Sequence, residues 1–319
     1  MPKSLFGYIW RAGAKHQVAL CALSIAVFLL STVPLELQRR LVNDAIKRGA
    51  LDAILWLALA YAAVSLAEGG IKLFLNIYRS WVSERAVLDL RGRIGKLTGR
   101  AAESDDSGGA GGVEVSMMLS EVEPIGSFIG LSISEPLLQG GILLSVFGYL
   151  AFLEPWLALL AIGIFSPQLV FVPLIQGAIN RRVERRIQTL RKVSGGIVDA
   201  ASSGNGVDEP RREQQVAQVF RLNMGVFKLK FSMSFLMNLL HHLGVATALG
   251  VGGWHVVQGS LELGTVVAFV SGLGKVNDPW RDVVNWFREM MVARVRYGLI
   301  SSGMRKIAVA EPVALASRA

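Results

Sequence analysis

The chain has 319 residues, of which 52% are apolar and 18% charged, with a mean hydropathy of +0.46 and a formal net charge of +9 at pH 7. It is too apolar for an ordinary soluble protein and too long for one membrane hairpin, which indicates a multi-span membrane protein. Basic segments beside anionic lipid account for the charge, so no nucleic-acid partner is expected.

The N-terminal stretch is amphipathic. One helical face is shared by Leu5, Phe6, Ile9 and Trp10. This pattern predicts an interfacial helix over residues 1–16 that lies among the lipid headgroups. The apolar run that follows has no small-x-small cleavage site, so residues 17–37 are expected to be a retained first span. Cys21 is the only cysteine, which excludes an intrachain disulfide.

Six segments approach the ~20 apolar residues that are needed to cross ~30 Å of hydrocarbon. They are residues 17–37, 53–77, 131–153, 155–179, 232–257 and 263–287. With the N-terminus inside, the inner segments hold 25 of the 33 basic residues: three before the first span, six in 79–130, eleven in 181–230 and five after Arg288. The outer loops then hold four, which are Arg39, Arg40, Lys47 and Arg48. This bias predicts a multi-pass protein of the inner (plasma) membrane with both termini in the cytoplasm.

Two inner segments continue the helical spacing beyond the apolar runs. They are residues 79–100 and 181–192, and each meets a polar patch rich in helix breakers, at 103–115 and 202–213. Helical spacing resumes after each patch. The predicted fold is therefore an all-α membrane protein with six long transmembrane helices that extend into the cytoplasm and two intracellular helix–turn–helix excursions. The membrane domain is expected over 17–300, followed by a short cytoplasmic tail at 301–319.

The last apolar segment carries four charges near its middle: Lys275, Asp278, Arg281 and Asp282. At ~2.5 to 3.5 kcal/mol each, they would cost about 10 to 14 kcal/mol if they faced lipid. One helical stripe contains Lys275, Asp278, Asp282 and Asn285, and a second contains Asn277, Arg281 and Arg288. Such stripes favour a water-filled path or a seam between subunits, with a bend at Pro279. The alternative is that the segment leaves the membrane early and its charges lie in cytoplasmic water.

Two further pairs of residues favour structural roles. Glu68 and Lys72 are four residues apart in the favourable order, so they are expected to neutralise each other. His241 and His242 are adjacent, and adjacent helical side chains point about 100° apart. They cannot chelate one metal from a single helix face, so no metal site is predicted.

Four stretches resemble a known family in their order and spacing. They are "VPLELQRRLVNDAIKRG" at 33–49, "GVEVSMMLSEVEPIGSFI" at 112–129, "GGWHVVQGSLELGTVVAF" at 252–269 and "DPWRDVVNWFREMMVARVRYGLI" at 278–300. Together they resemble the six-helix transmembrane domain of ABC exporters, the type 1 or type IV fold. Met117 stands where the family has an arginine, and Glu121 where it has an aspartate. Pro279 and Arg296 match the family's exit from the last span.

The resemblance implies a homodimer or heterodimer of similar membrane subunits whose sixth span lines the substrate path. The expected path residues are Lys275, Asn277, Asp278, Arg281, Asp282 and Asn285. The two excursions are expected to dock onto an ATPase, with Glu114, Ser116, Glu121, Asp208 and Glu213 as contacts. No G-x-x-x-x-G-K-[ST] phosphate loop occurs in the sequence, and only residues 301–319 follow the membrane domain. ATP and Mg are therefore expected on a separate ABC nucleotide-binding protein. No directly bound cofactor and no enzymatic activity are expected of the chain itself.

The sequence thus predicts the permease subunit of an ATP-driven ABC transporter, of the exporter type. One alternative is a transport-incompetent regulatory or scaffold subunit derived from such an exporter, which the glycine-rich "SGGAGG" at 107–112 favours. Another is a secondary carrier, but such carriers are built from inverted repeats and broken helices, and neither pattern is evident in the sequence.

Overall fold

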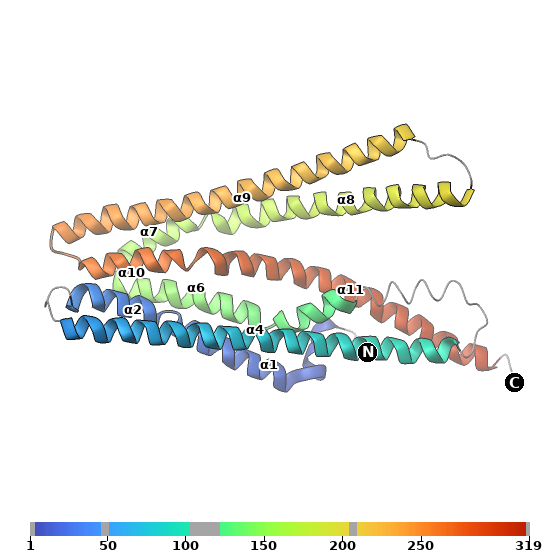
Figure 1. Cartoon of the computed structure of the whole chain (residues 1–319), viewed down its shortest axis with the longest axis horizontal. Helices are drawn as coiled ribbons and strands as arrows, with labels where there is room; N and C mark the ends of the chain where they lie inside the picture. Colours follow the sequence, from blue (N-terminus) through green and yellow to red (C-terminus); the bar gives the residue numbers. More distant parts are fainter. Residues whose placement is uncertain (1–3, 46–50, 103–121, 204–208, 317–319) are drawn as a thin grey trace. The chain divides into compact units, whose positions relative to one another are not determined.

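The computed structural model describes residues 4–45, 51–102, 122–203 and 209–316, and every regular element among them is a helix. The helices are labelled in chain order in Figure 1. Their bounds are α1 Leu5–Leu30, α2 Val33–Arg40, the π-helix η1 Leu41–Ala45, α4 Leu51–Ala102, α6 Ser134–Leu153, α7 Pro155–Phe165, α8 Gln168–Ser203, α9 Glu209–Val257, α10 Leu263–Gly274 and α11 Asn277–Ala316. A further helical segment covers 122–131. The described residues form two compact units, one within 1–152 and 262–319 and the other within 153–261.

Five helical stretches are long and apolar enough to cross a membrane. They are Gly13–Asn43, Leu51–Lys96, Val122–Leu153, Pro155–Leu190 and Glu213–Val257. The sixth predicted segment, 263–287, is interrupted, because α10 ends at Gly274 and α11 begins at Asn277. The structure thus confirms an all-helical chain with several candidate spans in its described residues, and the six-span layout stays a prediction.

Several helices are much longer than a bilayer requires. Helix α4 has 52 residues and α9 has 49, and α11 and α8 have 40 and 36. At ~1.5 Å per residue α4 alone is about 78 Å long, more than twice the ~30 Å of hydrocarbon. Such helices must project into water if they cross a membrane. The predicted turns of the two excursions lie largely outside the described residues.

Prolines break three of the helices about one turn before the proline itself. Pro34 follows the two-residue break between α1 and α2, Pro136 the break that precedes α6, and Pro279 the break between α10 and α11. Proline has no amide proton and its ring clashes with the carbonyl four residues earlier, so the helix opens there. Pro173 is an exception, because α8 continues through it. The broken-helix pattern that was not evident in the sequence is therefore present in the predicted first, third and sixth segments, and the break in the sixth lies next to the bend predicted at Pro279.

The first helix has two parts. It begins at Leu5 with Ser4 as its N-cap, and it bends at Gly13, whose φ and ψ are −166° and 42°. Leu5 and Ile9 are buried, whereas Phe6 and Trp10 are exposed. The predicted apolar face is therefore divided between a protein contact and the surface. Helix α1 also ends before residue 37, and α2 and η1 carry the helical path on through Arg39 and Arg40 to Ala45, so these two arginines do not lie in a loop.

In the first unit α4 packs against α1, α2 and α11, and α10 packs against α2 and η1. Its fully buried side chains include Leu20, Leu75, Ile125, Phe128, Leu138, Phe269 and Tyr297. Small residues permit close helix contacts at several points. A Cβ at Gly141 would collide with Phe28, and a Cβ at Gly126 with Val87.

The second unit is built mainly from α8 and α9, with α7 packed against α9. Buried apolar residues hold it together, among them Leu157, Phe165, Val172 and Met237. Near the polar half of α8, Arg186 donates to the side-chain oxygen of Asn223 on α9, at 3.0 Å. This unit therefore has an apolar portion and a more polar portion along the same helix pair.

The most apolar part of α4 is hardly buried by the rest of the chain. Leu55, Trp56, Leu59 and Leu66 are all more than half exposed. A soluble monomer rarely exposes so continuous an apolar surface, whereas lipid or another membrane subunit covers it naturally.

Candidate functional site

Lys275 lies at the break between α10 and α11, where it is the C-cap of α10. Its Nζ donates to the carbonyl of Ser31 at 2.8 Å and lies 3.7 Å from Oε2 of Glu68. Ser31 is itself the C-cap of α1, and its carbonyl is open because the Leu35 amide bonds Thr32 instead. The ammonium therefore sits at the C-terminal ends of two helices, where the helix dipole favours a cation.

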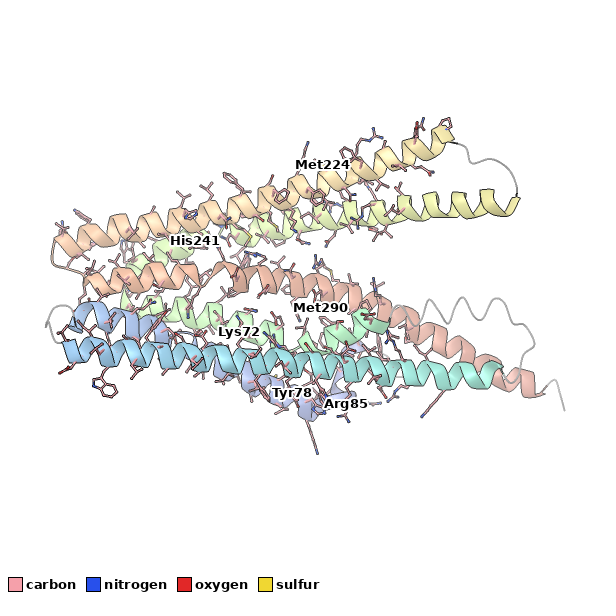
Figure 2. The ribbon with its side chains drawn as sticks, viewed as in Figure 1. Lys72, Tyr78, Arg85, Met224, His241 and Met290 are labelled. Carbon is pink, nitrogen blue, oxygen red and sulfur yellow. The ribbon has the colours of Figure 1, made fainter. Side chains whose placement is uncertain are left out.

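Glu68 has a different partner from the predicted one. Its carboxylate lies near Lys275 of another helix, and no ion pair joins it to Lys72. Lys72 is exposed on α4, in the middle of the helix (Figure 2). The prediction that Glu68 and Lys72 neutralise each other is wrong, because a side chain brought by tertiary packing is a better partner than the helical neighbour.

A second polar layer joins α4, α6 and α11. Arg79 is 5% exposed and forms a short ion pair with Glu135. Its Nε donates to the hydroxyl of Ser134 at 2.9 Å. Gln139 links the pair to α11, since its Nε2 donates to Glu135 Oε1 at 2.8 Å and to Asp282 Oδ2 at 3.1 Å. Arg79, Glu135, Gln139 and Asp282 are called the buried charge layer below.

The proline break before α6 also takes part in this region. Pro136 cannot donate to the carbonyl of Ser132, and the indole Nε1 of Trp286 on α11 donates to it instead, at 3.1 Å. The open carbonyls of Ser31 and Ser132, at two broken helix ends, thus each accept a hydrogen bond from a side chain within residues 275–286. The segment that was predicted as span 6 is the one that connects the broken ends.

The predicted path residues do not all lie together. Lys275 and Asp282 make the buried contacts described above, whereas Asp278 and Arg281 form a more exposed pair at 3.1 Å. Asn277 and Asn285 are half-buried, and the Oδ1 atom of Asn277 is buried without a hydrogen-bond partner. The break between α10 and α11 interrupts the regular rotation from one residue to the next. Lys275 therefore does not share one helical face with Asp278, Asp282 and Asn285. Whether these residues line a substrate path stays a prediction.

Most of the predicted ATPase contacts cannot be placed. Glu114, Ser116, Glu121 and Asp208 lie outside the described residues. Glu213 is in α9 and is exposed. Its position is compatible with a contact to another protein, which stays a prediction.

A third polar cluster was not predicted. Glu36 accepts hydrogen bonds from Arg39 Nε at 2.9 Å, Arg40 Nε at 2.6 Å and the Tyr149 hydroxyl at 2.7 Å. Beside it, Asn43 of η1 donates to Glu262 at 2.5 Å and accepts from the Gly264 amide at 2.7 Å. The spacing of Glu36 from Arg39 and Arg40, i+3 and i+4, was the available sequence signal. Asn43 gave no such signal, because its partners come from a segment more than two hundred residues away.

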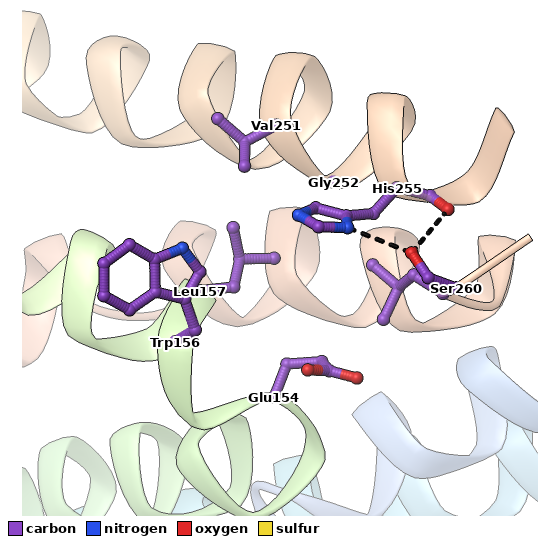
Figure 3. Close-up of a pocket in the computed structure, with 8 residues that line it drawn as sticks. Glu154, Trp156, Leu157, Val251, Gly252, His255 and Ser260 are labelled. Atoms are coloured by element: carbon purple, nitrogen blue, oxygen red, sulfur yellow. Dashed lines mark hydrogen bonds between the residues drawn. The ribbon is translucent and has the colours of Figure 1, made fainter. Parts of the chain in front are cut away.

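The second unit contains a pocket of about 370 Å³ near the ends of α7 and α9 (Figure 3). His255, Glu154 and Trp156 line it. The hydroxyl of Ser260 donates to the His255 carbonyl at 3.0 Å and lies 3.0 Å from His255 Nδ1. Since the hydroxyl proton is used, Nδ1 is the donor of the second contact, and Nε2 is the remaining ring nitrogen. No motif in the sequence pointed to this pocket.

Comparison with known proteins gives two distant relatives, and no family model matches the chain. The chain is 24% identical over 282 residues to an ATP-dependent lipid A-core flippase of Syntrophus aciditrophicus (strain SB), which covers 85% of this chain and 46% of the flippase. It is 21% identical over 241 residues to a protein of Bacillus subtilis (strain 168) that is named as a multidrug export ATP-binding/permease protein, YgaD. That match covers 72% of this chain and 41% of the relative. The chain thus matches less than half the length of either relative.

Proposed function

We propose that this chain is the membrane-spanning permease part of an ATP-driven ABC transporter of the exporter type. It works as a homodimer or heterodimer in the lipid bilayer, with both termini in the cytoplasm and six spans per chain. Nucleotide-binding domains on a separate subunit bind ATP and Mg. Hydrolysis there, and not in these 319 residues, drives movement of the substrate.

The observation that carries this proposal is the match over 85% of the chain to an ATP-dependent flippase. One feature of the structure and one of the sequence agree with it. The helices α4 and α9 are long enough to pass a movement from a cytoplasmic ATPase to the membrane. The absence of a phosphate-loop motif from the sequence is consistent with ATP binding elsewhere.

In this proposal the segment from Lys275 to Asp282 is the part of the chain that meets the substrate path. Lys275 contacts the end of α1 and Glu68 of α4, and Asp282 contacts Gln139 of α6. A movement of these helices therefore changes the surroundings of both charges. A charge whose partners change between two states is a means by which ATP-driven motion can alter substrate affinity.

Reconstitution tests the division of labour. The purified chain in lipid nanodiscs should show no ATP hydrolysis above background, and addition of its nucleotide-binding partner should produce hydrolysis and substrate movement. Glu213→Lys should weaken this stimulated activity, because it reverses a charge at a proposed contact. Glu184→Lys is the matched control, since Glu184 is also exposed and lies on the neighbouring helix α8.

Other outcomes would change the assignment. Hydrolysis by the isolated, mass-verified chain contradicts the proposal directly. Failure to assemble with any nucleotide-binding protein would favour the scaffold or regulatory alternative. The broken helices remove one argument against a secondary carrier, so transport driven by an ion gradient without ATP would favour that class.

A further inference from the structure

A pocket of about 300 Å³ lies between the first part of α1 and the middle of α4. Arg11 and His16 line it from α1, and Arg85, Asp89 and Arg93 line it from α4. Ile9, Val82 and Ile129 give it an apolar wall. Neither Lys275 nor any residue of the buried charge layer lines it, and the proposed transport function does not use it.

More cationic than anionic side chains line this pocket. Asp89 is its one lining carboxylate, and it accepts from the Tyr8 hydroxyl at 2.7 Å and from Arg93 Nε at 2.8 Å. Burial, helped by the hydrogen bond to Asp89, raises the pKa of Tyr8 above its usual value, so the phenol remains a donor to the carboxylate. In the described part of the chain, no carboxylate lies within ion-pair distance of Arg11 or Arg85. The pocket therefore has two guanidinium groups available for an anion.

One of these groups is held in place by an aromatic ring. The guanidinium carbon of Arg85 lies 5.0 Å from the centre of the Trp81 ring, in a cation–π contact. The planar guanidinium keeps its N–H groups for other partners, and its fork matches two oxygens of a phosphate. Tyr78 and Arg85 lie along the same side of α4, toward α1 (Figure 2).

An aromatic ladder leads from the apolar part of α4 to this arginine. The rings of Phe74 and Tyr78 are 6.1 Å apart and nearly parallel, and those of Tyr78 and Trp81 are 5.9 Å apart and nearly parallel. Phe74 and Trp81 are exposed. This ladder is a flat, accessible apolar surface that ends at a cation. An acyl chain can lie along it while its phosphate meets Arg85.

The position along the helices suits a lipid headgroup. The apolar run of α4 ends near Ile77, and Arg85 is eight residues further, about 12 Å along the axis. The interfacial layer of a bilayer adds about 5 to 8 Å beyond the hydrocarbon on each side, and arginine reaches back several ångströms. Trp10 and Trp81 are exposed beside the pocket, as aromatic residues at a membrane interface commonly are.

We infer that this pocket binds the phosphate of an anionic glycerophospholipid, with Arg11 and Arg85 as phosphate ligands and the aromatic ladder as the acyl-chain contact. Phosphatidylglycerol fits this chemistry, because it combines a net negative headgroup with acyl chains. A zwitterionic lipid fits less well, since its ammonium would meet two guanidinium groups. The bound lipid fixes the first part of α1 against α4.

Lipid titration of the purified full chain, followed by native mass spectrometry, tests this inference. Phosphatidylglycerol should bind about tenfold more tightly than phosphatidylcholine with the same acyl chains, and Arg11→Gln with Arg85→Gln should reduce this preference to about twofold or less. The matched control is Arg91→Gln with Arg294→Gln, which removes two exposed arginines outside the pocket. Arg85→Lys keeps the charge without the fork, so it should retain an intermediate preference.

A second arm separates a lipid from a free phosphate. Inorganic phosphate and glycerol phosphate are added as competitors, and both should displace phosphatidylglycerol poorly, because they cannot use the aromatic ladder. Displacement by either compound at the lipid's own concentration would overturn the lipid assignment. An unchanged preference in the double pocket variant, or an equal loss in the control variant, would overturn the site itself. Thermal unfolding of each variant confirms that the comparison is made on folded protein.

Discussion

Arg79 and Glu135 are ionised side chains within helices that are candidate membrane spans, and they stabilise each other there. Removal of one partner leaves the other charge buried without compensation, which typically costs about 3 to 5 kcal/mol. We therefore expect Glu135→Leu to lower the unfolding temperature of the purified protein markedly. The double variant Arg79→Met with Glu135→Leu should recover most of the loss, because it removes both charges and keeps similar volumes.

An exposed ion pair provides the control for this experiment. Arg91 and Glu123 lie 3.8 Å apart, with exposed side chains. Surface pairs of this kind contribute about 0 to 1 kcal/mol, so Glu123→Gln should leave the unfolding temperature nearly unchanged. Equal effects of the Glu135 and Glu123 variants would contradict the structural importance of the buried pair.

Lys275, Asp278 and Asp282 differ in their surroundings, so their accessibility can be measured separately. In a background without Cys21, a cysteine at 278 should react with water-soluble thiol reagents in every state, because the Asp278 side chain is 81% exposed. Cysteines at 275 and 282 should react to an extent that changes with the nucleotide bound by the ATPase partner. If both resist the reagent in every state, the region is a dry seam and not a substrate path.

The charged side chains of the last segment show which contacts can be predicted from the sequence and which cannot. The charges of the last segment were identified, because four ionised side chains in an apolar run are costly wherever they face lipid. The partners of Lys275 and Asp282 were not, because Ser31 and Gln139 are distant in the sequence and carry no pattern that points to them. Glu68 was assigned the wrong partner for the same reason.

At the scale of helices, proline chemistry decides where the elements end. The breaks before Pro34, Pro136 and Pro279 follow from the missing amide proton, but α8 continues through Pro173, so the sequence contained only part of the information needed to predict them. The apolar runs alone did not contain it, since hydropathy is the same on both sides of a break. Five of the predicted segments fall within helices that are long and apolar enough to cross a membrane, and the sixth is interrupted by its own break.

The contact between α10 and η1 depends on a glycine. The Gly264 amide bonds Asn43, and a Cβ at this position would collide with the Arg39 carbonyl and lie 2.6 Å from Cγ of Asn43. Backbone atoms of a packed helix cannot easily give way, and overpacking of this kind costs about 1 to 3 kcal/mol. We therefore expect Gly264→Ala to lower the unfolding temperature.

The same helix offers a matched comparison. Gly274 is the last residue of α10, and a Cβ there would meet no atom within 4 Å. Gly274→Ala should leave the unfolding temperature unchanged or slightly raised, since alanine favours a helix over glycine. If both variants behave alike, the close contact at Gly264 is not a determinant of stability.

At the scale of the whole molecule, helix lengths agree with a membrane protein that extends well into water. The predicted orientation rests on the distribution of basic residues, and the structure changes one part of that count. Arg39 and Arg40 belong to α2 and both contact Glu36, so the predicted first outer loop retains only Lys47 and Arg48. The segments that are predicted to lie inside hold 25 of the 33 basic residues, which is the larger share.

Cysteine labelling of intact cells tests this orientation. Single cysteines are placed at 258–262, in the predicted turn between the last two spans, and at 104–112, in the predicted first excursion, with Cys21 removed. A reagent that cannot cross the membrane should modify the first group and spare the second, because the positive-inside rule places the basic segments beside the second group in the cytoplasm. Membrane permeabilisation should make both groups reactive, which shows that the spared cysteines are accessible once the barrier is removed. The opposite pattern in intact cells would invert the topology, and it would place the proposed ATPase contacts on a side of the membrane where no ATPase can reach them.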